Sequence, residues 1–158
     1  MSSGIHIVDI DVIPIVVRGD IDFVISEGKT RIHTSIIVRL LTNDDNIEGI
    51  GEIVCAPPGK PEELPEEIVG AIENVVKPVL VGLDATARTK ASTLVNAALK
   101  GKHWTKAGIN NAMYDLQAKV MRTSVSTLLG GPLACDVPIM GTVIGLNTPD
   151  FMANQAFE

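Results

Sequence analysis

Aromatic side chains and cysteines are scarce in this sequence of 158 residues. Aromatic residues make up 3% of the chain, too few to build stacking platforms for nucleic-acid bases or sugars. The two cysteines, Cys55 and Cys135, lie far apart in the sequence and outside any CxxC or Cys/His spacing. They therefore predict neither a zinc site nor a disulfide framework, and we expect free thiols.

Long hydrophobic runs and stripes of positive charge are also missing. No apolar run approaches the roughly 18 to 20 residues of a membrane span, and the first residues lack the pattern of a signal peptide. Lys and Arg number 13 against 19 Asp and Glu, a net charge of -6, and the basic residues are scattered singly. The sequence thus argues against nucleic-acid and membrane partners and predicts a soluble, cytoplasmic protein.

The sequence does contain enough apolar residues to form a core, 46% against 20% charged, in the length of one ordinary domain. A β-branched run over residues 5–17 predicts a strand, and Pro14 places part of it at a sheet edge or a bulge. Alternating residues 34–40, a polar turn over 42–46 and an extended segment over 49–57 complete a short antiparallel meander.

Beyond residue 57 the apolar period changes to about 3.6, which predicts helices. Apolar residues 68, 72, 75 and 76 favour a helix that ends at Pro78, and a second helix follows from about Ala85 to Gly101. Its expected inward face consists of Ala87, Ala91, Leu94, Val95 and Ala98. A third helix carries the clearest apolar stripe, formed by Ile109, Ala112, Met113, Leu116 and Val120. Strands followed by helices predict an α+β domain.

After Pro132 the sequence predicts a new apolar strand over residues 137–146. A helix should begin near Pro149, because Asn147 or Thr148 can act as its N-cap. We therefore expect a domain over residues 1–132 and the start of a second over 133–158.

Few residues suggest chemistry by themselves. The histidines, His6, His33 and His103, have no metal-ligand spacing and are expected to be structural or surface residues. Glu48 and Glu52 share one face of a strand, where a solvated edge is a better interpretation than acid/base catalysis.

A glycine pair and two single residues could also suggest chemistry. Gly49 and Gly51 form a GxG that lacks the rest of a dinucleotide fingerprint. Asp115, beside the apolar stripe, should form an ion pair or accept a backbone N–H. Cys55 could be a nucleophile, although a small apolar loop residue is the favoured interpretation.

Four segments in order resemble the enolase superfamily, in particular its muconate-lactonizing enzyme and mandelate racemase families. They are GIGEIVCAP over 49–57, VKPVLVGLDA over 76–85, MYDL with Lys119 over 113–119, and LLGG over 128–131. Ile50 replaces the usual aromatic residue of the first segment. The resemblance implies an enolase-like capping domain, a three-stranded meander with a helical bundle, followed by the first strand of an incomplete TIM-type barrel.

The resemblance also implies where substrate would bind. Residues 18–31 would be a mobile lid loop, with Phe23, Val24 and Ile25 as its apolar tip. Residues 55–61, beginning at Cys55, would form a second loop over the active site. Thr142 would lie near the carboxyl end of the first barrel strand, the end at which barrel enzymes bind substrate.

The implied activity is removal of a proton α to a carboxylate, with Mg²⁺ stabilising the enediolate, in a cycloisomerase, racemase or epimerase. The Mg²⁺ ligands and catalytic lysines of the family would lie beyond Glu158, so we expect the 158-residue chain alone to be inactive and to hold no metal. Its partners would be a small carboxylate substrate and further copies of itself in a homo-oligomer. Two alternatives stay open, a sugar-acid dehydratase of the racemase branch and a stand-alone cap acting as an interaction module.

Overall fold

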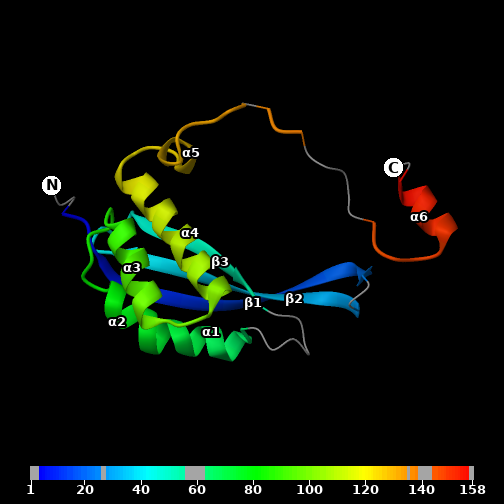
Figure 1. Ribbon diagram of the computed structural model, residues 1–158, viewed down its shortest axis with the longest axis horizontal. Helices are drawn as coiled ribbons and strands as arrows, with labels where there is room; N and C mark the ends of the chain where they lie inside the picture. Colours follow the sequence, from blue (N-terminus) through cyan, green and yellow to red (C-terminus); the bar gives the residue numbers. More distant parts are fainter. Residues whose placement is uncertain (1–3, 26–27, 56–62, 135, 139–143, 157–158) are drawn as a thin grey trace.

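The computed structural model describes residues 4–25, 28–55, 63–134, 136–138 and 144–156. A three-stranded antiparallel sheet comes first in the chain, and helices follow it. Figure 1 shows the sheet crossed by the helices, with the C-terminal helix set apart from them. The observed order confirms the predicted α+β class and the meander with helices.

The sheet consists of β1 (Ile7–Ile25), β2 (Gly28–Thr42) and β3 (Glu48–Val54) in the order β1-β2-β3. Both outer strands are therefore edges, and Pro14 lies in one of them, as expected for a residue without an N–H to donate. The turn between β2 and β3 is held by the Thr42 hydroxyl, which donates to the carbonyl of Ile47 at 2.7 Å.

The first two strands are longer than the sequence predicts. The prediction of a loop over residues 18–31 was wrong. β1 continues to Ile25 and β2 begins at Gly28, with Val24 paired to Lys29. The pairing register shifts between Arg18 and Phe23, so β1 contains extra residues there. Glycines and charges concealed the strand pattern, yet the backbones of residues 23–25 pair with residues 28–30.

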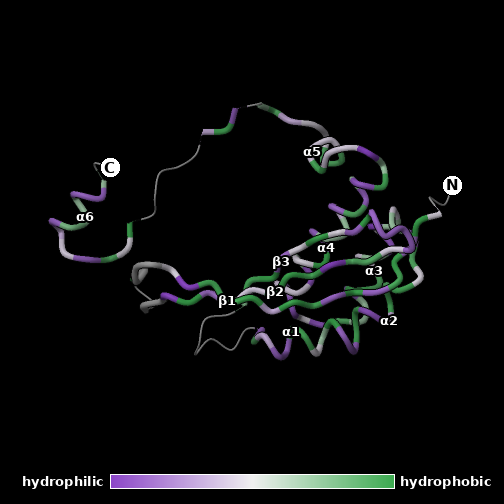
Figure 2. Tube along the Cα trace, turned by 180° about the vertical axis from the view of Figure 1, so that it is seen from behind, coloured by the Kyte–Doolittle hydropathy of each residue, from purple (hydrophilic) through white to green (hydrophobic). Residues whose placement is uncertain are grey.

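One face of the sheet is buried and the other is open. Ile36, Val38 and Leu40 of β2 are fully buried beneath the helices, as are Ile10 of β1 and Ile53 of β3, each at 1% exposure. Figure 2 shows the strands from the side opposite to that of Figure 1, with α1 running alongside them. The core therefore lies in a single layer between sheet and helices.

The first helical segment passes through Pro78 instead of ending there, which corrects the sequence prediction. α1 (Pro65–Ala71), the π-helical η1 (Ile72–Val76) and α2 (Lys77–Leu80) follow one another directly. Proline within a helix lacks a donor and crowds the carbonyl four residues earlier. We attribute the continuation to the wider π turn just before Pro78, which relieves this conflict and lets Leu80 reach the core.

Two further helices, α3 (Arg88–Ala98) and α4 (His103–Val120), complete the layer. The apolar stripe predicted on α4 is confirmed, since its first four members are buried and Val120 packs against the core. On α3, Ala91 and Val95 are buried as predicted, whereas Ala98 is exposed. The core position at the end of α3 belongs to Leu99, one residue later, where the helix has already ended.

Helix α4 lies very close to β3 because glycines face each other across the interface. A Cβ on Gly49 would lie 2.3 Å from the carbonyl oxygen of Ala112, and one on Gly51 would lie 2.2 Å from that of Gly108. Gly108 in turn has no room for a Cβ, which would lie 2.2 Å from Ile53 Cγ1. The GxG of β3 is therefore a packing device rather than part of a dinucleotide site.

Two short helices follow, α5 (Val125–Leu128) and α6 (Pro149–Ala156). Gly130 and Gly131 after α5 have φ values of 107° and 92°, a conformation that explains two glycines at this point. Thr148 caps α6 as predicted, with its hydroxyl oxygen 3.4 Å from the N–H of Phe151. In the predicted barrel strand, residues 137–138 and 144–146 form no strand, and residues 139–143 lie outside the described residues.

Candidate functional site

The end of the β1–β2 hairpin contacts the segment that leads into α6. The N–H of Leu146 donates to the carbonyl oxygen of Val24 at 2.7 Å, although the two residues are far apart in the sequence. Val24 is half-buried, and the backbones of Phe23 and Ile25 pair with Thr30 and Gly28. The predicted tip residues are thus held on a paired hairpin, next to the segment that the resemblance assigns to the barrel.

Cys55 lies at the end of β3 and is almost completely buried, at 6% exposure. Its N–H donates to the carbonyl of Thr34 at 3.0 Å, which extends the ladder by one bond. Burial raises the pKa of the Cys55 thiol, and the negative charges of Glu63 and Glu66 raise it further. A thiol held protonated in this way is a poor nucleophile.

The structure does not bring Cys55 next to the hairpin end. Cys55 bonds to Thr34 of β2 and Val24 pairs with Lys29 of β2, so their partners are five residue steps apart along one strand. At about 3.3 Å per residue this is a separation of about 17 Å. Thr142, the remaining predicted substrate-binding residue, lies outside the described residues.

Asp115 and Lys119 of α4 bind the free edge of β3. The carboxylate of Asp115 accepts the N–H of Ile50 at 2.8 Å and the ammonium of Lys119 at 2.7 Å. Lys119 also donates to the carbonyl of Glu48 at 2.9 Å. Both expected partners of Asp115 are therefore present, and the MYDL and Lys119 positions act as a clamp that covers an exposed strand edge.

Glu48 and Glu52 lie on the open face of β3, as predicted. Glu48 binds Arg39 of β2 at 2.6 Å, and Arg39 also reaches Asp11 of β1 at 3.1 Å. The bond to Glu48 raises the pKa of the Arg39 guanidinium above its ordinary value. These three residues link all three strands, an arrangement that uses Glu48 for sheet pairing.

Glu63 caps helix α4, a role that the sequence did not predict. Its buried carboxylate accepts the N–H groups of Trp104 and Thr105, each at 2.8 Å, and the hydroxyl of Thr105 at 2.5 Å. It thereby caps the first turn of α4 from a position before α1. No local capping signal precedes His103, so the sequence offered no clue to this partner.

Within the described residues, no group of three His, Cys, Asp or Glu side chains could hold a metal ion. The described part of the chain therefore does not fit the Mg²⁺ of the resemblance. No helix among the described residues is long and apolar enough to cross a membrane.

Comparison with known proteins identifies the family. The sequence family described as "Mandelate racemase / muconate lactonizing enzyme, N-terminal domain" matches residues 10–130. The chain belongs to this family. Its fold, a meander covered on one side by helices, is the capping domain that the motifs of β3, α4 and the LLGG turn resemble.

The relatives of this chain within the family include cycloisomerases. Chloromuconate cycloisomerase of Pseudomonas sp. (strain P51) is 32% identical over 120 residues, which are 75% of this chain and 32% of that protein. The muconate lactonizing enzyme of Pseudomonas fluorescens, solved with muconolactone, is 28% identical with a TM-score of 0.76, over 82% of this chain and 35% of that one.

A second enzyme type has the same fold. N-succinyl Arg/Lys racemase of Bacillus cereus superimposes with a TM-score of 0.84 at 27% identity, over 96% of this chain and 40% of that one. The chain thus spans about a third of the length of the curated relatives that it matches.

Proposed function

We propose that this chain is the N-terminal capping part of a cycloisomerase-type enzyme that removes a proton α to a carboxylate. Similarity to muconate and chloromuconate cycloisomerases supports this reaction class over the sugar-acid dehydratases. The residues that transfer protons and bind metal would lie outside these 158 residues. The chain would contribute the shape of the substrate pocket.

The observation that carries the proposal is the bond between Leu146 and Val24. It joins the hairpin end to the segment that would enter the barrel, so the apolar residues 23–25 would stand beside the catalytic face. Apolar side chains at that place exclude water and contact the substrate. Cys55 is buried in the core, so we do not expect it to touch substrate.

Kinetics of the complete enzyme with Val24→Ala test the proposal. We expect KM for a muconate-type acid to rise severalfold, or the preference among acids to change, because a lost apolar contact costs about 1 to 3 kcal/mol. The affinity for Mg²⁺ should not change. Val16→Ala is the matched control, since Val16 lies on the same strand, is 68% exposed and precedes the hairpin end.

Two results would contradict the proposal. One is unchanged kinetics of the Val24 variant over a panel of carboxylic acids. The other is a gene whose reading frame ends directly after Glu158, because such a protein would lack the catalytic residues altogether.

A further inference from the structure

Helices α3 and α4 line a small, half-open cavity that the proposed function does not use. Its volume is about 240 Å³. The floor is apolar and formed by the buried residues Ala91, Val95, Ile109 and Met113. Such a floor disfavours a fully hydrated inorganic ion and suits the apolar body of a small organic molecule.

Polar side chains surround the mouth of this cavity. They are Ser92, Asn96, His103, Lys106 and Asn110. Among the described residues, none of them has a side-chain hydrogen bond or ion pair, whereas most charged side chains of the sheet are paired. The cavity thus presents unused donors around an apolar floor, the combination that orients a ligand in a binding site.

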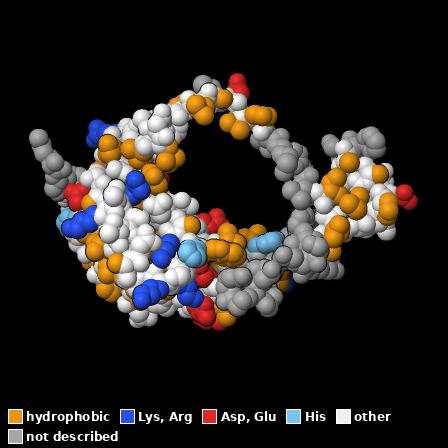
Figure 3. All heavy atoms as spheres, viewed as in Figure 1, with side chains coloured by type: hydrophobic (Ala, Val, Ile, Leu, Met, Phe, Trp, Pro, Cys, Tyr) orange, Lys and Arg blue, Asp and Glu red, His pale blue; other side chains and the backbone are white. Residues whose placement is uncertain are grey.

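The stretch of chain that forms α3 and most of α4 around the cavity has positive charges and no negative ones, although the chain as a whole is negative. Residues 85–114 contain five Lys and Arg and no Asp or Glu, in a chain of net charge -6. Figure 3 shows blue side chains and a histidine gathered over the helical face. The fold thus groups basic residues that look scattered in the sequence, and an anion is the ligand that this face attracts.

The number of unpaired Lys and Arg side chains at the cavity indicates which kind of anion it could bind. Lys102 is bound to Glu67, and the Arg88 guanidinium lies 4.1 Å from the centre of the Tyr114 ring. The first N–H groups of α4 are taken by Glu63. Lys106 is therefore the one lysine that lines the cavity, and a single ammonium with amide donors matches a monocarboxylate better than a phosphate.

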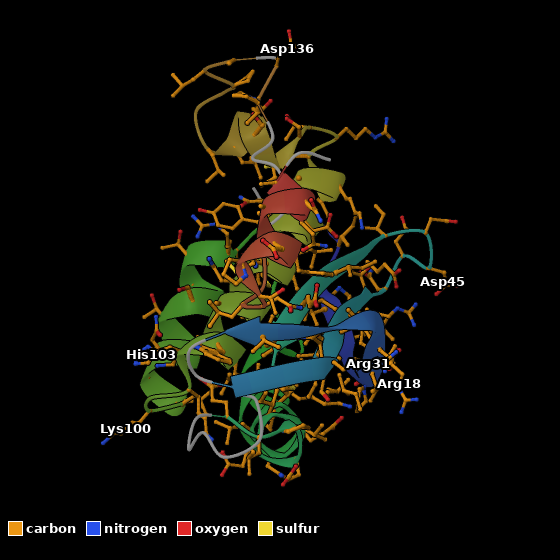
Figure 4. The ribbon with its side chains drawn as sticks, turned by 90° about the vertical axis from the view of Figure 1, so that its right-hand side faces the viewer. Arg18, Arg31, Asp45, Lys100, His103 and Asp136 are labelled. Atoms are coloured by element: carbon orange, nitrogen blue, oxygen red, sulfur yellow. The ribbon has the colours of Figure 1, made fainter. Side chains whose placement is uncertain are left out.

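We propose that the cavity between α3 and α4 binds a small organic monocarboxylate. The carboxylate would bind Lys106, with Asn96 and Asn110 as further donors, and the apolar body would cover Val95 and Met113. The cavity lies on the helical side of the cap. In Figure 4, Lys100 and His103 lie on that side, opposite Arg18 and Arg31 near the hairpin. The proposed ligand would thus occupy a second site, separate from the one at the hairpin end.

Titration of the ¹⁵N-labelled 158-residue chain with benzoate, followed by NMR, tests this inference. We expect saturable shifts confined to the amides of α3 and the first half of α4. Benzamide, which has the same ring without the charge, should bind at least about fivefold more weakly, as should inorganic phosphate. Lys106→Gln should weaken benzoate binding about fivefold, and Lys106→Arg should restore most of it.

Lys90→Gln is the matched control, because it removes the same charge from an exposed position of α3 that does not line the cavity. Benzoate affinity should not change in this variant. Equal weakening by both Gln variants would show diffuse attraction to a basic surface and overturn the proposal. So would absence of saturable shifts, or equal binding of benzamide or phosphate. These outcomes do not bear on the hairpin, so the two proposals can fail separately.

Discussion

Gly51 lies where β3 and α4 are in close contact. A Cβ there would lie 2.2 Å from the carbonyl of Gly108 and 2.9 Å from the N–H nitrogen of Ala112, both backbone atoms that cannot move aside. We expect Gly51→Ala to destabilise the chain by about 2 to 4 kcal/mol, because the helix must shift away from the sheet. Urea unfolding followed by circular dichroism measures the effect.

Gly70→Ala is the control for this substitution. Gly70 lies within α1, and a Cβ there would find no atom closer than Asn74 Nδ2 at 3.9 Å. Alanine is the better helix former, so this variant should be as stable as the parent or gain up to about 1 kcal/mol. A Gly51→Ala chain as stable as the Gly70 variant would show that the interface is loosely packed.

Asp9 gives the chain a defined response to acid. The hydrogen bond from Lys77 and the N–H of Ile10 hold the pKa of the Asp9 carboxyl below its ordinary value of 3.8. A lowered folded-state pKa adds stability above about pH 3.8, which is lost as the pH falls through the folded value. Lys77→Gln should therefore be less stable than the parent at pH 6 and approach it at pH 2.

Thermal melts at the two pH values measure this difference. Lys90→Gln serves as the control, since Lys90 is exposed and has no side-chain partner among the described residues. The melting temperature of Lys90→Gln should differ little from that of the parent, and the difference should be the same at both pH values. A Lys77 effect of the same size at both pH values would contradict the assignment.

At the scale of elements, the clamp between α4 and the edge of β3 can be tested directly. Asp115→Ala removes the acceptor of the Ile50 N–H and the partner of Lys119. We expect faster hydrogen exchange at the amide of Ile50 and a loss of about 0.5 to 1.5 kcal/mol, because the exposed edge N–H exchanges its carboxylate partner for water. Glu52→Ala, at an exposed position of the same strand, should leave that exchange unchanged.

The elements also show where sequence patterns suffice. The stripe of α4 and the alternation in β2 and β3 were predictable because one face of each is buried, which imposes a regular period. The hairpin over 18–31 was not, because its pairing partners lie in the neighbouring arm and not in the local pattern. Pro78 misled for a similar reason, since a π turn earlier in the helix accommodates it.

At the scale of the molecule, long-range contacts decide what the sequence conceals. The cap of α4 by Glu63 spans 41 residues, and the basic face of α3 and α4 forms only when two helices meet. The motifs revealed the family, whereas the contact between Val24 and Leu146 required coordinates. Packing patterns are local, so they can be predicted from the sequence. A site cannot be predicted in the same way, because side chains from separate segments form it.

The segment after Pro132 differs from the rest of the molecule in how much apolar surface it exposes. Leu133 is fully exposed, Val137 is 76% exposed and Leu146 is 51% exposed. Figure 1 shows α6 lying away from the helical layer. Apolar residues without a covering layer favour association, so we expect the 158-residue chain to self-associate and a chain ending at Pro132 to be monomeric.

Light scattering of both chains at matched concentrations measures this difference. Val137→Lys in the longer chain should shift it toward the monomer, because a charge at that position opposes burial. Val8→Lys, on an exposed position of β1 at 43%, adds the same charge to the cap and should not change association. The opposite result would be a monomeric long chain together with a destabilised short one. It would mean that residues 133–156 pack on the cap and stabilise it, and the division of the chain at residue 132 would then have no physical basis.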